Sequence, residues 1–193
     1  MDAVTLEEIK RKAFHMLTLI YVAGYWFLPW EVTIIGMAVV LLFVITMEAL
    51  RLNNPSLNKW VLSTLGGVHR KEETHHMSGL VFTLSGSLLT MLIFEDKCIV
   101  VASMLYLSFG DSIAAIIGKQ RGKNKIWNKK SLEGSLSCFV VCVLVGLAFL
   151  RWDYALLGAL VATLIETIPW PLNDNFWMPL ISAAILSHFI YIL

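Results

Sequence analysis

The chain has 193 residues, of which 58% are hydrophobic, and its formal net charge is +1. Its mean hydropathy of +0.72 is far above that of a soluble domain, and the apolar residues come in long blocks. The composition therefore excludes a soluble globular class and predicts an integral membrane protein.

Seven apolar blocks are near the length that an α-helix needs to cross about 30 Å of hydrocarbon. They are residues 14–30, 32–50, 78–94, 98–118, 135–150, 154–170 and 176–193. Several are short, so we expect tilt or local thinning of the bilayer. The first block follows basic residues, as in a signal peptide, but no small-residue cleavage site follows it, and we interpret it as a retained helix.

The basic residues predict the orientation. With the N-terminus in the cytoplasm, 13 of the 15 lysines and arginines lie on that side, and only Lys97 and Arg151 lie opposite. The longer loops, 51–77 and 119–134, then face the cytoplasm, and the C-terminus lies outside. We expect an all-α polytopic membrane protein with about seven transmembrane helices, folded as a single integral-membrane catalytic domain over residues 1–193.

The most informative stretch is 110–135, because it joins an acid in an apolar helix to a basic loop. A carboxylate such as Asp111 inside a membrane helix costs about 2.5–3.5 kcal/mol on insertion scales, which marks it as a functional-site candidate. Six cations follow it, namely Lys119, Arg121, Lys123, Lys125, Lys129 and Lys130. This combination is typical of a site that binds a polyanion by charge and bridges part of it through a metal ion.

The glycines and lysines of this stretch have distinct expected roles. Gly110, beside the acid, leaves room for a nucleotide or metal to approach. Gly118 and Gly122 let the loop backbone turn, while Lys119 and Lys123 bring charge to phosphate oxygens. A basic loop that only contacts anionic lipid headgroups is the alternative, but it explains neither the buried acid nor the ordered glycines.

The fifth helix begins directly after this loop. Ser131 is placed to cap it, and Glu133 lies near its positive N-terminal dipole. Since a helix N-terminus is also an anion site, Lys130 and Ser131 are candidate phosphate ligands, and Glu133 is a candidate ligand for metal or water.

Ionisable side chains on four different blocks lie in the half of the bundle nearest this loop. They are His15, Glu48, Asp111 and Glu166. Each alone fits an interfacial residue that reaches water, but together they indicate a shared cavity. Cys138 and Cys142 share a helix face without a histidine or carboxylate, so we expect them to pack in the core.

These motifs resemble a known family, the CTP-dependent lipid kinases. The stretch 110–123 is similar to their GD and GK elements, and KSLEGS at 130–135 to their KS-x-EGS element. Residues 11–15 are similar to their RK-x-x-H, 48–51 to their E-x-x-R, and 174–179 to their DN-x-x-x-P. Members include dolichol kinase, phytol kinase and yeast-type diacylglycerol kinase.

The resemblance implies CTP as the phosphate donor, Mg²⁺ as the cofactor and a lipid alcohol from the bilayer as the acceptor. It adds nucleotide ligands to those above, namely Arg11, Lys12, Gly134 and Asn175. The expected metal ligands are Asp111, Asp174 and Glu166. The candidate catalytic residues are Asp111, Glu133, Glu48 and His15, and the general base is left open.

A weaker relationship extends to the CDP-diacylglycerol synthases, so a phosphatidate cytidylyltransferase is the alternative function. The chain carries no charge after Asp174 in its last apolar block, which favours the kinase. A membrane transporter is the second alternative, although the acids gather at one face. The acceptor is open among polyprenol, dolichol, phytol-type alcohols and diacylglycerol. We expect no nucleic acid partner, and the oligomeric state, including a homodimer, is open.

Overall fold

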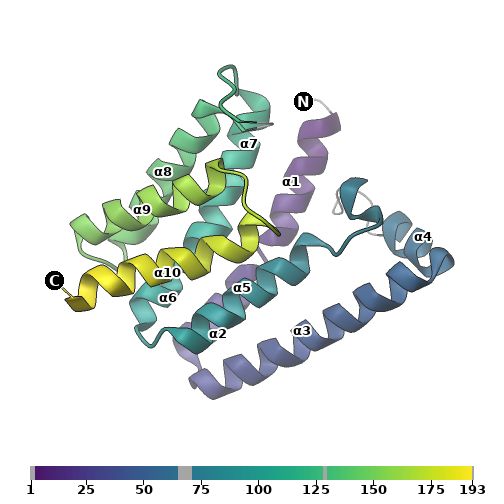
Figure 1. The fold of residues 1–193 in the computed structure, drawn as a ribbon, viewed down its shortest axis with the longest axis horizontal. Coiled ribbons are helices and arrows are strands. Elements are labelled where there is room, and N and C mark those ends of the chain that lie inside the picture. The colour runs from purple at the N-terminus through teal and green to yellow at the C-terminus, as the bar shows by residue number, and fades with distance from the viewer. Residues whose placement is uncertain (1–2, 65–70, 128–129, 193) are drawn as a thin grey trace.

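The computed structural model describes residues 3–64, 71–127 and 130–192 (Figure 1). Its helices are α1 (Ala3–His15), α2 (Thr18–Phe27), α3 (Trp30–Asn53), α4 (Pro55–Thr64), η1 (Lys71–Thr74), α5 (Gly79–Ile93), α6 (Lys97–Leu105), η2 (Tyr106–Asp111), α7 (Ser112–Gln120), α8 (Leu132–Leu147), α9 (Trp152–Thr167) and α10 (Asp174–Ile192). Within these ranges the only β pairing is an isolated bridge between Lys125 and Ser131. The expected all-helical class is confirmed.

Two stretches are long and apolar enough to be candidate membrane spans. One is α3, and the other is the continuous run Lys97–Gln120, each of 24 residues. The apolar helices α5 and α8 have 15 and 16 residues, or about 22 and 24 Å at the helical rise per residue. They are shorter than the hydrocarbon thickness, and the seven-span topology stays a prediction.

The first apolar block does not form one helix. Here α1 ends at His15 and α2 begins at Thr18, with a turn between them at Met16 and Leu17. With 10 residues, α2 is about 15 Å long and too short to cross a bilayer alone. The prediction of a single helix over 14–30 is therefore wrong. Pro29 precedes α3 and suits this reversal of the chain, because it lacks a backbone N–H.

The block 98–118 is a continuous helical run, but its centre, η2, is a π-helix. Tyr106 begins this wide turn and is completely buried. A Cβ added to Gly146 in α8 or Gly158 in α9 would lie 2.6 or 2.7 Å from its hydroxyl oxygen, so the two glycines form the slot for its ring. The π-helix ends at Asp111, and such turns are frequent at functional sites.

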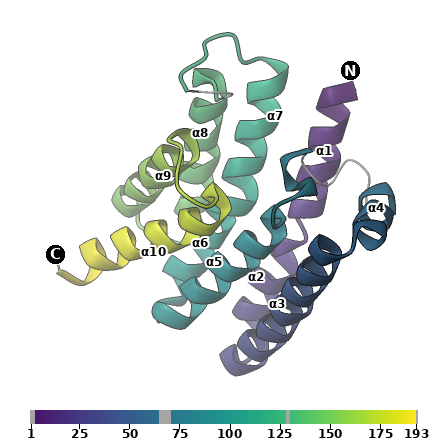
Figure 2. The same ribbon diagram turned by 45° about the vertical axis from the view of Figure 1, so that its right-hand side comes forward.

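The helices α7 to α10 form one side of the bundle, in which α8 packs between α7 and α9. The helix α3 lies at the opposite edge and packs mainly on α5 (Figure 2). Much of its surface is apolar and uncovered, with Val39 63% and Leu42 67% exposed. A helix with such an exposed apolar surface suits contact with lipid.

Candidate active site

Asp111 lies where η2 meets α7 and is almost completely buried. Its Oδ2 accepts a hydrogen bond from Nζ of Lys12, which is equally buried in α1. The two residues are 99 positions apart in the sequence, and their pair joins α1 to the end of η2. A buried acid that keeps its charge needs such a partner, because desolvating a lone charge costs several kcal/mol.

His15 follows one turn after Lys12 in α1 and faces the same acid. Its Nε2 lies 3.9 Å from Oδ2 of Asp111, which is too far for a hydrogen bond. Although this nitrogen is buried, it has no hydrogen-bond partner among the described residues. Sequence reasoning placed His15 and Asp111 on one side of the bundle, and the structure brings them together.

Lys130 forms a second cluster with two acids. Its Nζ lies 2.6 Å from Oε1 of Glu166 in α9 and 3.1 Å from Oδ2 of Asp174 at the start of α10. Burial alone lowers the pKa of this ammonium, but the charges of Asp174, Glu166 and Asp111 outweigh it and raise the pKa above its ordinary value. Lys130 therefore stays protonated, and the two clusters are electrostatically connected.

The basic loop is held in a hairpin-like shape by its own backbone. Leu132 N donates to Asn124 O over 2.9 Å, and Ile126 N donates to Lys130 O over 3.1 Å. Ser131 caps α8, as predicted, by accepting from Gly134 N over 3.3 Å. Consequently the loop and the N-terminus of α8 form one unit.

Glu133 lies in the first turn of α8 and its side chain points back to the loop. It accepts hydrogen bonds from the backbone N–H and the side-chain amide of Asn124, the latter over 2.9 Å. These bonds fix the loop, whereas a catalytic or metal-binding role for Glu133 stays a prediction.

A charged side chain of α1, Glu8, also contacts the start of the stretch 119–134. Glu8 is 1% exposed and forms ion pairs with Arg11 in its own helix and with Lys119 at the end of α7. Lys123 is exposed at the loop surface, and Lys129 lies outside the described residues. Sequence reasoning missed Glu8, although its i, i+3 spacing to Arg11 on a helix is a signal for such a pair.

Three glycines in and beside the loop permit close packing. A Cβ on Gly134 would lie 2.7 Å from the carbonyl oxygen of Ala114 in α7. A Cβ on Gly118 would lie 3.2 Å from Ser131 Oγ, and one on Gly122 would collide with the carbonyl oxygen of Gly118. These three glycines therefore let α7, the loop and α8 approach one another.

Gly110 also permits close packing, deeper inside the bundle. A Cβ there would lie 2.6 Å from Cys142 Sγ and 3.1 Å from Cys138 Sγ. The expectation that Gly110 leaves room for a nucleotide or metal is corrected, because the two sulfur atoms fill that space. Both cysteines are completely buried, so their predicted packing role is confirmed.

Glu48 belongs to a different network from Asp111. Its two carboxylate oxygens accept from Nε and Nη2 of Arg51, each over 2.7 Å, and Oε2 also accepts from Ser78 N over 2.7 Å. Arg51 donates in turn to the carbonyl oxygens of Glu73 and His76. Glu48 and Arg51 thus attach residues 73–78 to α3, and a catalytic role for Glu48 stays a prediction.

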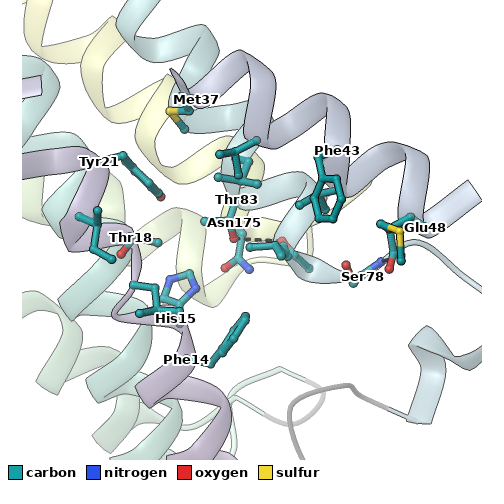
Figure 3. Close-up of a pocket in the computed structure, with 18 of the residues that line it drawn as sticks. Phe14, His15, Thr18, Tyr21, Met37, Phe43, Glu48, Ser78, Thr83 and Asn175 are labelled. Carbon is teal, nitrogen blue, oxygen red and sulfur yellow. Dashed lines mark hydrogen bonds between the residues drawn. The ribbon is translucent and has the colours of Figure 1, made fainter. Parts of the chain in front are cut away.

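A cavity of about 820 Å³ lies between α1, α2, α3 and α5. Figure 3 shows His15 on one wall, Glu48 on the opposite wall and Asn175 between them. Arg11 and Lys12 also line it. The cavity therefore begins beside the buried acid and its cations.

The three expected metal ligands are suited to magnesium brought in with a nucleotide. Mg²⁺ prefers oxygen ligands and is usually held by one or two carboxylates plus substrate phosphates. Asp111, Glu166 and Asp174 supply such oxygens around Lys12 and Lys130. In the part of the chain that the structure describes, no three His, Cys, Asp or Glu side chains are grouped to hold a metal ion by themselves.

Comparison with known proteins identifies the family. CTP-dependent diacylglycerol kinase 1 of Saccharomyces cerevisiae is 30% identical over an alignment that covers 96% of this chain and 74% of the yeast protein. The chain belongs to the CTP-dependent lipid kinase family. Its members are enzymes, and the resemblance seen in the motifs is confirmed.

Other relatives agree with this membership. An uncharacterized protein of Rickettsia prowazekii is 30% identical over an alignment that covers 96% of each chain. A probable phytol kinase 1 of Glycine max is 32% identical over an alignment that covers 55% of this chain and 41% of the plant protein. No family model matches the chain. No solved structure matches it either.

Proposed function

We propose that this member of the family transfers the γ-phosphoryl group of CTP to the hydroxyl of a membrane lipid alcohol, with Mg²⁺ assistance. Diacylglycerol, phytol-type alcohols, polyprenol and dolichol all fit as acceptors, because each presents a hydroxyl on an apolar body. The names of the yeast and soybean relatives support a lipid acceptor and CTP.

One observation carries the proposal. Asp111 is buried at the end of η2, close to the charges of Lys12 and Lys130 and beside His15, and both Lys12 and His15 line an apolar cavity. A phosphoryl transfer from a nucleotide to a lipid needs cations for phosphates, carboxylates for a metal ion and an apolar space for the acceptor, all at one place. In this protein the cations, the carboxylates and the apolar space lie close together.

In this proposal the nucleotide phosphates bind between the hairpin loop and α1. Lys119 and Lys123 contact phosphate oxygens from the loop, and the capped N-terminus of α8 faces them with its positive dipole. Arg11 and Asn175 contribute from the cavity side. Positioning by these groups orients the γ-phosphorus for in-line attack.

The ion pairs of the described structure suggest how the site responds to its substrate. Lys12 and Lys130 are bonded to Asp111, Glu166 and Asp174. Phosphates that draw the two ammonium groups away would free the carboxylates. The freed oxygens would hold Mg²⁺, which neutralises charge on the transferring phosphoryl group.

We also propose that the chain crosses the membrane about seven times, with its N-terminus and active site facing the cytoplasm. The 13-to-two distribution of basic residues supports this orientation. The kinase function requires it as well, because CTP is a soluble cytoplasmic nucleotide.

The proposed reaction is tested with CTP labelled at different phosphorus atoms. A kinase moves γ label into the lipid phase and releases CDP, whereas a cytidylyltransferase moves α label there and releases pyrophosphate. Purified protein, Mg²⁺ and a panel of long-chain alcohols and diacylglycerol should give γ-labelled lipid with CDP as coproduct. Recovery of α label in the lipid phase, dependent on phosphatidic acid, would replace the kinase assignment.

A further inference from the structure

The cavity extends well beyond the polar residues at its inner end. Its volume of about 820 Å³ lies within the range of about 300–1,000 Å³ that is usual for small-molecule sites. Its lining includes Leu84 of α5. Met37 of α3 and Tyr21 of α2 line it as well (Figure 3). Most of its wall is therefore apolar, which suits a hydrocarbon chain.

The cavity borders the apolar outer surface. Ile20 of α2 and Phe43 of α3 both line it, yet they are 70% and 64% exposed. Gly36 of α3 also lines the cavity and leaves free space, since a Cβ added there would meet nothing within 4 Å. If the candidate span α3 crosses the membrane, this exposed side of the cavity would face hydrocarbon.

The inner end offers a place for one hydroxyl group. Nε2 of His15 is buried without a hydrogen-bond partner among the described residues and lies 3.9 Å from Oδ2 of Asp111. An unprotonated ring nitrogen without a partner can accept one hydrogen bond from a ligand O–H group. The remaining part of such a ligand would extend into the apolar cavity.

We propose that this cavity is the acceptor site, entered from the bilayer between α2 and α3, with the lipid hydroxyl donating a hydrogen bond to Nε2 of His15 beside Asp111. The inference rests on the proposed kinase function. In the transfer, the hydroxyl proton passes to Nε2 of His15 and the oxygen forms a bond to the γ-phosphorus. The bond from that phosphorus to the bridging oxygen breaks, and CDP leaves with the electron pair.

A matched pair of substitutions tests the path of the lipid chain. Val40 lines the cavity, whereas its neighbour Val39 is equally apolar, is 63% exposed and does not line it. We expect Val40→Trp to lower kcat/KM for a long-chain alcohol about tenfold and to leave the KM for CTP within about twofold. Val39→Trp should match the wild type in both. Gly36→Leu narrows the same space and provides a second variant if Val40→Trp folds poorly.

A photoreactive probe separates lipid binding from turnover. A long-chain alcohol with a diazirine in its chain should label α2, α3 and α5 at the cavity, and Val40→Trp should reduce this labelling. His15→Asn should lower kcat with little change in labelling, because the chain site remains intact.

The outcomes distinguish the two proposals. If the wild type labels at the cavity but phosphorylates no alcohol or diacylglycerol, the lipid site stands and the kinase function fails. If the wild type is active while Val40→Trp and Val39→Trp behave alike, the acceptor site is wrong and the kinase function stands. Labelling confined to other helices would also overturn the acceptor site.

Discussion

At the scale of single residues, the buried pair of Lys12 and Asp111 connects stability to chemistry. Asp111→Asn leaves the Lys12 ammonium buried without its charge partner, and breaking such a pair costs about 3–5 kcal/mol. We expect lower thermal stability in detergent and loss of turnover. Adding Lys12→Met should restore most of the stability without restoring activity. If Asp111→Asn keeps more than about a tenth of wild-type kcat, the acid is not part of the reaction.

Lys123 offers a cleaner test of the nucleotide site, because it is exposed and its removal leaves no buried charge. Loss of one charge-assisted contact to phosphate costs about 1.5–3 kcal/mol, so Lys123→Ala should raise the KM for CTP by at least about tenfold. Lys59→Ala removes an equally exposed lysine from α4 and serves as the control. Equal KM values for the two variants would place the phosphates elsewhere.

Residues of the candidate site were predictable where a charged residue in an apolar block also belongs to a motif of the family. The sequence places Asp111 and His15 on one side of the bundle because a charge in an apolar block is costly, and the structure brings them together. It does not predict that Lys12 is the partner, since α1 was not expected as a separate helix. The cavity was not predictable from the sequence either, because it depends on how α2, α3 and α5 are spaced.

At the scale of helices, the slot between Gly146 and Gly158 holds Tyr106, the first residue of the π-helix that ends at Asp111. A methyl group on Gly158 would approach the hydroxyl oxygen and Cε2 of Tyr106 to 2.7 and 2.8 Å, and overpacking of this kind costs about 1–3 kcal/mol. Gly158→Ala should therefore lower the melting temperature and, by displacing the turn, reduce kcat. Gly36→Ala is the stability control, because its added methyl meets open space. A melting temperature unchanged by Gly158→Ala would show that the slot can widen to accept the added methyl group without loss of stability.

Helix positions were predictable to different degrees. The expected block 32–50 lies within α3 and the expected block 78–94 matches α5 closely, because both are continuous apolar runs between polar turns. The break at Met16 and Leu17 was not predictable, since neither residue is a helix breaker. The π-helix was not predictable either, because hydrophobic periodicity does not reveal the tertiary packing around Tyr106.

At the scale of the whole molecule, the contacts divide the bundle into two ends. At one end lie the ion pairs that join α1, the hairpin loop, α9 and α10, such as Lys119 with Glu8 and Lys130 with Asp174. The other end has the cation–π contact of Lys97 with Trp26 and the aromatic pair of Trp26 with Phe149. Trp beside Lys is typical of a membrane interface, so the two ends suit the two membrane surfaces.

This division predicts which engineered cysteines an impermeant reagent reaches in sealed, right-side-out cells. Glu95→Cys is suitable for the outer end because Glu95 is exposed, whereas Asp96 caps α6. Lys125→Cys is suitable for the inner end, since it spares the bond from Asn124 to Glu133. In a Cys98→Ser background, with Cys138 and Cys142 buried, only Glu95→Cys should react until the cells are opened. Reaction of Lys125→Cys in intact cells would place the loop outside, away from cytoplasmic CTP, and would overturn both the orientation and the proposed access of the nucleotide.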